Sequence, residues 1–296
     1  MAAFKAGFVA VLGQTNVGKS TFLNAILGRK LLITSAKPQA TRNRVRLVLT
    51  TEEAQLVFID TPGLHRPHNV LSRQVLREAF RALRGVDVIA YMVEPWGEVS
   101  SYDEAMIERL REVEKPAILL VNKRDLARSN ALEETLLAYD AKECFKELIP
   151  ISSTRRSNLD DAVATLVRYL PEGPPLFPAD VVTDQTEAFI IAELIREKVY
   201  RYTHQEIPYA VAVAIRHLEE RDDGLVEITA EIIVDKPSQK GIVIGAHGRR
   251  IKEIGTGARK EIESVLGTRV FLDLKVNVIR GWTKDRQLIR ELTGSS

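Results

Sequence analysis

Apolar and polar positions follow two different patterns in the two parts of this chain. In the first part, short apolar runs of the kind buried on both faces of a parallel sheet alternate with stretches of helical periodicity. The runs predict strands over 4–12, 44–50, 55–59, 86–93, 117–121 and 148–151, and the periodic stretches predict helices over 21–27, 71–83, 105–113, 132–145 and 159–170. This alternation predicts an α/β domain with a mostly parallel sheet covered by helices on both faces.

A cluster of prolines ends this pattern: Pro171, Pro174, Pro175 and Pro178. Such a density can neither continue a helix nor lie in a central strand. We therefore expect a first domain over 1–172, a linker over 173–182 and a second domain over 183–296. The pattern of the second domain predicts helix 184–202, hairpin strands 210–219 and 225–234, a short helix, a glycine loop at 245–248, helix 249–266 and strand 269–278.

Composition adds little to this picture until it is examined by segment. The 296 residues carry a net charge of +2, the apolar and charged fractions are those of a soluble globular protein, and no run is long and apolar enough to span a membrane. We see no export signal, and the single cysteine, Cys144, fits a reducing cytoplasm. From 184 to 235 there are five basic and twelve acidic residues, but from 236 to 296 there are thirteen basic and six acidic residues. The basic segment is either a polyanion-binding surface or a solvated face that pairs with the acidic segment.

A phosphate-binding loop follows the first predicted strand. The sequence Gly13-Gln14-Thr15-Asn16-Val17-Gly18-Lys19-Ser20 fits the pattern of Gly, four residues and Gly-Lys-Ser, and a helix-compatible run follows it. Backbone N–H groups of such a loop surround phosphate oxygens, the lysine adds a charge for the outer phosphates, and the Ser20 hydroxyl is placed to bind Mg²⁺. The candidate nucleotide-binding residues of this region are Gly13, Gln14, Thr15, Asn16, Val17, Gly18, Lys19, Ser20 and Thr21.

A second nucleotide motif, Asp60-Thr61-Pro62-Gly63-Leu64, follows strand 55–59. The Asp60 carboxylate can hold Mg²⁺ through water, and the Gly63 N–H can bind a γ-phosphate and lose that bond on hydrolysis. Thr41, between the first helix and the second strand, is a further candidate Mg²⁺ ligand when GTP is bound. The predicted metal ligands are therefore Ser20, Thr41 and Asp60.

A third motif, Asn122-Lys123-Arg124-Asp125, follows strand 117–121 and indicates guanine. The Asp125 carboxylate can accept hydrogen bonds from both N1–H and the N2 amine of guanine, whereas adenine would leave that carboxylate desolvated and unpaired. Asn122 can bridge the loop and the base, and the Lys123 stem can lie over the ring. Ser152 and Ser153 end the next strand, where a backbone N–H can meet the guanine oxygen.

The residues for hydrolysis are less evident than those for binding. The candidate catalytic residues are Lys19, Thr41, Gly63 and Asn16. Leu64 stands where Ras-like enzymes have a glutamine and cannot polarise water, so we expect slow intrinsic turnover that depends on an added component. The Asn16 side-chain carbonyl is a candidate ligand for a monovalent cation such as K⁺.

A glycine loop in the second domain is a candidate RNA site. Apolar residues ending at Ile244 precede Gly245-Ala246-His247-Gly248, and a basic amphipathic helix follows with Arg249, Arg250, Lys252 and, further along, Arg259. A glycine loop between two helices lets a nucleic-acid backbone approach closely. Trp282, with Lys284 and Arg286 near it in sequence, either stacks on a base or caps the core.

Together these motifs resemble the Era family, bacterial GTPases with a C-terminal KH domain. The resemblance covers nearly the whole chain, including Gln39-Ala40-Thr41-Arg42 and the stretch from Val243 to Arg259. It implies a P-loop GTPase domain and a type II KH domain that binds the 3′ end of small-subunit ribosomal RNA during ribosome maturation. It also implies that Mg²⁺ and GTP or GDP are the ligands, and that the protein is cytoplasmic with some peripheral association with the inner membrane. We expect the protein to be a monomer. Gln14-Thr15 and Ser153 depart from the usual Arg-Pro and Ala of the family, at positions that act mainly through backbone.

Three functions remain open at this point. The chain is an RNA-linked GTPase switch, a nucleotide-gated RNA scaffold with incidental hydrolysis, or a membrane-associated signalling GTPase whose basic segment faces acidic lipid. Aliphatic residues beside the glycine loop favour RNA over lipid, and no strongly amphipathic terminal helix is evident.

Overall fold

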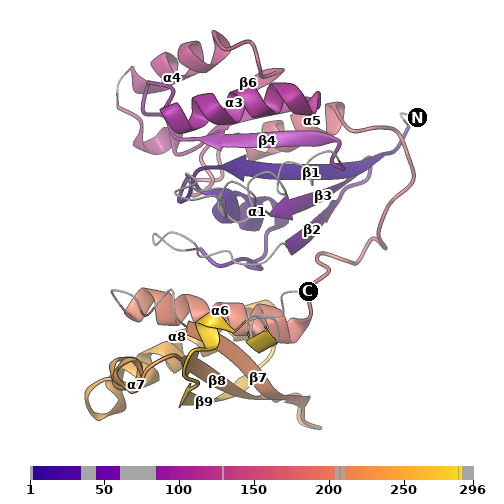
Figure 1. Cartoon of the computed structure of the whole chain (residues 1–296). Helices are drawn as coiled ribbons and strands as arrows, with labels where there is room; N and C mark the ends of the chain where they lie inside the picture. The colour runs from indigo at the N-terminus through magenta and orange to yellow at the C-terminus, as the bar shows by residue number, and fades with distance from the viewer. Residues whose placement is uncertain are drawn as a thin grey trace. The chain divides into compact units, whose positions relative to one another are not determined.

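The computed structural model describes residues 3–34, 45–60, 85–128, 130–203, 207, 211–285 and 287–288. The chain forms two compact units, drawn in Figure 1. The first comprises Met1–Gly28 and Arg44–Asp184, and the second comprises Arg29–Asn43 and Gln185–Ser296. The described residues 29–34, which follow the first helix, are grouped with the second unit, which the sequence did not indicate.

The first unit contains a six-stranded sheet in which every neighbouring pair is parallel except the antiparallel pair β2–β3. In spatial order the strands are β2 (Val45–Thr50), β3 (Ala54–Asp60), β1 (Lys5–Gly13), β4 (Val88–Val93), β5 (Ala117–Val121) and β6 (Glu147–Pro150). Every residue of β3, β4 and β5 is buried, as the continuous apolar runs predict for strands covered on both faces.

Helices cover this sheet. They are α1 (Lys19–Leu27), α3 (Ser101–Val113), the short 3₁₀ helix η1 (Arg124–Leu126), α4 (Ala131–Asp140) and α5 (Leu159–Arg168). Helices α3 and α4 lie on one side of the sheet, and α1 packs with α5 (Figure 1). Tyr102, Met106 and Leu110 of α3 recur at helical spacing and are buried against β1, β4 and β5. The predicted helix over 71–83 lies outside the described residues.

Several helix boundaries differ from the sequence prediction, and two of the differences have a clear local reason. Helix α3 begins at Ser101 rather than 105, because the Ser100 side chain caps it by accepting a hydrogen bond from the backbone N–H of Asp103 at 3.1 Å. Helix α4 ends at Asp140 rather than 145, and Glu143 beyond it has a positive φ of 50°. A left-handed residue cannot continue a right-handed helix.

The second unit has the element order that the sequence predicts. Its elements are α6 (Glu187–Tyr202), β7 (Val211–Glu220), β8 (Val226–Val234), α7 (Pro237–Ile244), η3 (Ala246–Gly248), α8 (Arg249–Leu266), β9 (Val270–Val278) and η4 (Trp282–Lys284). The strands form a sheet in the order β7–β8–β9, with β7 antiparallel and β9 parallel to β8.

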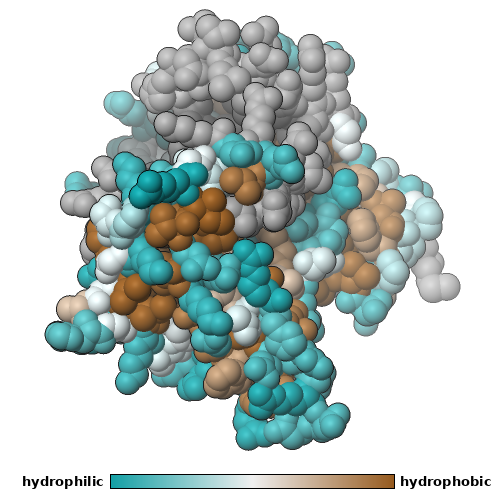
Figure 2. All heavy atoms as spheres, turned by 60° about the horizontal axis from the view of Figure 1, so that its bottom comes forward, coloured by the Kyte–Doolittle hydropathy of each residue, from teal (hydrophilic) through white to brown (hydrophobic). Residues whose placement is uncertain are grey.

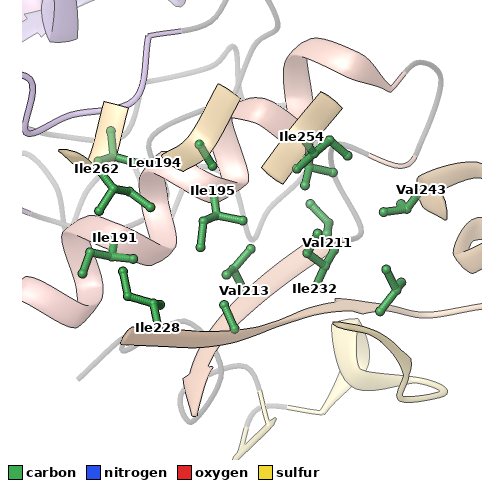
Figure 3. Packing of buried hydrophobic residues seen from close by; sticks show 14 of the residues in the cluster. Ile191, Leu194, Ile195, Val211, Val213, Ile228, Ile232, Val243, Ile254 and Ile262 are labelled. Atoms are coloured by element: carbon green, nitrogen blue, oxygen red, sulfur yellow. The ribbon is translucent and has the colours of Figure 1, made fainter. Parts of the chain in front are cut away.

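The core of this unit lies between its helices and one face of the sheet. Figure 3 shows Ile191, Leu194 and Ile195 of α6 directed toward residues of β7 and β8. Buried and half-buried residues alternate from Val226 to Ile232 of β8, which is the period expected of a strand with one buried face. Within the described part of the chain, no helix combines the length and apolarity needed to cross a membrane.

Candidate functional site

The phosphate loop joins the end of β1 to the start of α1 and needs its two glycines. Gly13 has a φ of 141° and Gly18 a φ of 106°. A Cβ on Gly13 would lie 2.3 Å from the carbonyl oxygen of Met92, and one on Gly18 would lie 2.2 Å from Nδ2 of Asn122. The backbone of β4 and the side chain of Asn122 therefore lie too close to the loop for a side chain at either position.

Lys19 is folded back across this loop. Its Nζ donates to the carbonyl oxygens of Gly13 at 2.9 Å and Gln14 at 2.7 Å, and the residue is 8% exposed. Burial lowers the pKa of Lys19 to about 8, an effect that the nearby charge of Asp60 partly opposes. The ammonium group is thus held where phosphate oxygens can replace the carbonyls as acceptors.

Asn122 connects three loops at the carboxyl edge of the sheet. Its Nδ2 donates to the carbonyl of Val17 at 2.8 Å, and its Oδ1 accepts from the N–H of Ser153 at 3.0 Å and from the Ser153 hydroxyl at 2.9 Å. The residue is 2% exposed. The bond to Val17 links Asn122 to the phosphate loop.

Asp125 lies in η1 with an exposed carboxylate. One carboxylate oxygen accepts a hydrogen bond from the Ser152 hydroxyl at 2.6 Å. The structure therefore brings Asn122, Asp125, Ser152 and Ser153 together, although the two serines alone carried almost no sequence signal.

Lys123 has a partner that the sequence did not reveal. It adopts a left-handed conformation with a φ of 62°, and its ammonium pairs with the carboxylate of Glu94, just beyond β4. Glu94 also accepts from the indole N–H of Trp96 at 2.8 Å. This contact orients the lysine at the same edge as Asp125.

Two of the three predicted metal ligands, Ser20 and Asp60, lie among the described residues. Asp60 is fully buried at the end of β3, and Ser20 lies in the first turn of α1. Thr41, Thr61, Pro62, Gly63 and Leu64 lie outside the described residues. Thr15, Asn16, Val17 and Thr21 all lie in the loop or in α1, and Val17 is buried.

The glycine loop of the second unit is shaped by positive φ values. They are 73° at Gly245, 52° at His247 and 73° at Gly248. A Cβ on Gly245 would lie 2.7 Å from Cβ of Arg250, whereas one on Gly248 would have no heavy atom within 4 Å. Only Gly248 therefore has space for a side chain.

The basic residues around this loop fall into two groups. Arg250 donates from Nη1 to the carbonyl of Ile242 at 2.7 Å and so braces the loop. Arg249, Lys252 and Arg259 are exposed, and Arg259 lies 3.9 Å from a carboxylate oxygen of Glu263. Figure 2 shows apolar patches among the polar side chains of one face of the molecule. Ile242, 39% exposed, offers such an apolar surface beside the loop, where Ile244 is half-buried.

The structure corrects the prediction that Trp282 binds RNA. Trp282 is 2% exposed and packs with Ala212 and Ile233 on the sheet. Its ring has no free face for a base, so the alternative that it caps the core is the one observed. Arg286 and the side chain of Lys284 lie outside the described residues.

Comparisons with known proteins agree with this geometry. Residues 8–123 match a family model described as a 50S ribosome-binding GTPase, and residues 206–283 match a KH domain model. The chain is 46% identical over 288 residues to the GTPase Era of Geotalea daltonii, covering 97% of each chain. It is 46% identical over 289 residues to the GTPase Era of Thermoanaerobacter sp. (strain X514), covering 97% of this chain and 96% of the relative.

Solved structures give the same result. Era from Aquifex aeolicus, as a variant bound to GDP and AlF₄⁻, matches with a TM-score of 0.90 and 38% identity, covering 99% of this chain and 100% of the other. Era in complex with MgGDPNP and nucleotides 1506–1542 of 16S ribosomal RNA matches with a TM-score of 0.89 and 37% identity, at the same coverage. These matches confirm the predicted fold class, a P-loop GTPase domain followed by a KH domain.

Proposed function

The chain belongs to the Era family of GTPases, and from that premise we propose that it is a switch that binds the 3′ end of 16S ribosomal RNA and acts in assembly of the small ribosomal subunit. One observation carries the proposal. An Era structure 37% identical to this chain, covering 99% of it, contains both a GTP analogue and that RNA segment. We place the action of the protein in the cytoplasm, with the small subunit as its partner.

Guanine recognition depends on the Asp125 carboxylate. With one oxygen held by Ser152, the carboxylate is oriented to accept from N1–H and the N2 amine of the base. The Ser153 N–H already donates to Asn122, so Asn122 fixes the loop that contains Ser153. The Lys123 stem covers the guanine ring from the side on which Glu94 lies.

Ser20 and Asp60 fit Mg²⁺, because hydroxyl and carboxylate oxygens are the hard ligands that this ion prefers. Asp60 is buried, and its charge acts on Lys19. When bound, Mg²⁺ neutralises charge that develops between the β- and γ-phosphates. Thr41 is the third proposed ligand, and the Gly63 N–H the proposed γ-phosphate contact.

Leu64 occupies the position of the Ras-like glutamine and cannot polarise water. We assign part of the missing positive charge to a monovalent cation held by the Asn16 side chain, whose backbone has a φ of 64°. Hydrolysis should be faster in K⁺ than in Na⁺, and Asn16→Ala should remove the difference. Equal rates in the two salts for the unchanged protein would contradict the assignment.

RNA binding is assigned to the loop of Gly245 and Gly248 and to the exposed cations Arg249, Lys252 and Arg259. The glycine backbone admits the phosphates, the cations neutralise them, and Ile242 and Ile244 offer apolar surface for unstacked bases.

The test exploits the space at Gly248. Asn and Asp both tolerate its left-handed backbone, and both side chains fit, but only Asp places a negative charge beside the RNA phosphates. Gly248→Asp should weaken binding of a short RNA copying the 16S 3′ end by about tenfold or more relative to Gly248→Asn. GDP affinity should be unchanged in both variants. Equal RNA affinity for the Asp and Asn variants would overturn the assignment of this loop.

A further inference from the structure

Asp103 is a buried carboxylate next to the nucleotide site. It lies in the first turn of α3 and is 4% exposed. Its Oδ1 accepts from the Tyr91 hydroxyl at 2.5 Å, and its Oδ2 accepts from the Ser100 hydroxyl at 2.5 Å and from the Gln14 side-chain amide at 2.9 Å. Each of these donors is uncharged.

The tyrosines around Asp103 remain donors over the working pH range. Burial and then the charge of Asp103 raise the pKa values of Tyr91 and Tyr139, which are almost completely buried. Both hydroxyls therefore stay protonated and directed at the carboxylate. Taking a carboxylate out of water is costly unless hydrogen bonds satisfy it, and here several donors fix its position.

Capping of α3 does not require this arrangement. The Ser100 side chain already caps the helix by accepting from the Asp103 N–H at 3.1 Å. An exposed acidic residue in the first turn would interact with the helix dipole equally well. The additional feature at Asp103 is its bond to Gln14, 89 positions away in sequence.

Gln14 is the second residue of the phosphate loop, and both its side-chain amide and its backbone carbonyl make hydrogen bonds. Its Nε2 donates to Asp103 and to the Ser100 hydroxyl oxygen at 3.0 Å. Its backbone carbonyl accepts from Nζ of Lys19 at 2.7 Å. A continuous set of hydrogen bonds thus runs from the buried tyrosines through Asp103 and Gln14 to the phosphate-binding lysine.

We propose that Asp103 is a positioning residue for nucleotide binding, which holds the phosphate loop in its binding shape through Gln14. A loop that is already ordered loses less conformational freedom when it binds phosphate, so nucleotide binds more tightly and leaves more slowly. This inference rests on the GTPase activity of the family and is independent of RNA binding.

The first test is a double-mutant cycle of Gln14→Ala and Asp103→Ala, read out as the dissociation rate of a fluorescent GDP. Loss of one such hydrogen bond should accelerate release about three- to tenfold in each single variant. The double variant should release GDP no faster than the faster single variant, because both changes break the same link. Multiplicative effects, or an Asp103→Ala protein with lower thermal stability but unchanged GDP release, would overturn the proposal.

The second test exchanges donor and acceptor. Gln14→Glu places two carboxylates together and should release GDP fastest. Adding Asp103→Asn supplies an amide donor to Glu at position 14 and returns the charge of the pair to that of the unchanged protein, so release should slow again. Failure of the second substitution to slow release would contradict the proposal.

Asp87→Ala is the matched control. Asp87 precedes β4, at the opposite end from the loop, and accepts from the N–H of Phe8 at 2.8 Å. This variant should reduce stability and leave GDP release unchanged. A faster release from Asp87→Ala equal to that from Asp103→Ala would show a general loss of rigidity and overturn the specific role.

Discussion

The proposed guanine-binding loops of the first unit are held by residues distant in sequence, whereas the glycine loop of the second unit is held by its own neighbours. Asn122 bonds to Val17 across 105 positions and to Ser153 across 31. In the second unit, Arg250 bonds to Ile242 across 8 positions, and Gly248 bonds to the carbonyl of Gly245. A single substitution in the first site should therefore disturb several loops, but one in the second site should act locally.

The largest effect should follow Asn122→Ala. The change leaves the Val17 carbonyl and the Ser153 N–H without their partner in a buried site, at about 1–3 kcal/mol for each group. GDP affinity, measured by titration calorimetry, should fall by about 100-fold or more. A loss of less than about threefold would mean that the three loops hold their positions without this residue.

Asp125→Asn should change which base is preferred. The amide can donate to the C2 carbonyl of xanthine but cannot accept two hydrogen bonds from guanine as the carboxylate does. GTP affinity should fall by about 100-fold and XTP affinity should rise, in competition against a fluorescent nucleotide. An unchanged preference for GTP would show that Asp125 does not read the base.

The pH dependence of GDP affinity should report the protonation of Lys19. Its pKa of about 8 in the nucleotide-free protein means that binding to phosphate takes up a proton above that pH. GDP affinity should therefore fall as pH rises through 8, by up to about tenfold per pH unit. Lys19→Arg is the control, because a guanidinium stays charged and its weaker binding should not vary in this way. The same pH profile in both proteins would assign the titration to another group.

The smallest effect should follow Trp282→Phe. Trp282 packs on Ala212 and Ile233, and its indole N–H has no partner among the described residues, so the smaller ring loses packing but no hydrogen bond. Stability should change by less than about 1.5 kcal/mol. RNA affinity should not change, and a clear loss of RNA affinity without a loss of stability would restore the stacking role.

The contrast between local contacts and contacts distant in sequence also explains which features the sequence could predict. The phosphate loop, the guanine motif and the glycine loop are local patterns, and Gly13, Gly18 and Gly245 lie where backbone or side chains leave no space for a Cβ. The strand runs also predicted β3, β4 and β5, because continuous burial leaves a continuous apolar signature.

The residues that the sequence missed act through tertiary contacts. Glu94, Asp103 and the pairing of Ser152 with Asp125 depend on which loops meet at one edge of the sheet. Trp282 could not be assigned from sequence because an aromatic residue beside basic ones serves equally well as a stacking platform or as a cap. The two roles are distinguished only by the tertiary contact of Trp282 with Ala212 of β7 and Ile233 of β8, which are paired in the sheet.

The central claim, that nucleotide state controls RNA binding, has one direct test. The affinity for a short RNA copying the 16S 3′ end should be measured with protein loaded with GDPNP and with protein loaded with GDP. We predict that the protein binds this RNA much more tightly in the GDPNP state. By linkage, bound RNA must then raise the affinity of the protein for GDPNP relative to its affinity for GDP. Equal affinity in the two states would contradict the switch and leave two independent binding modules on one chain.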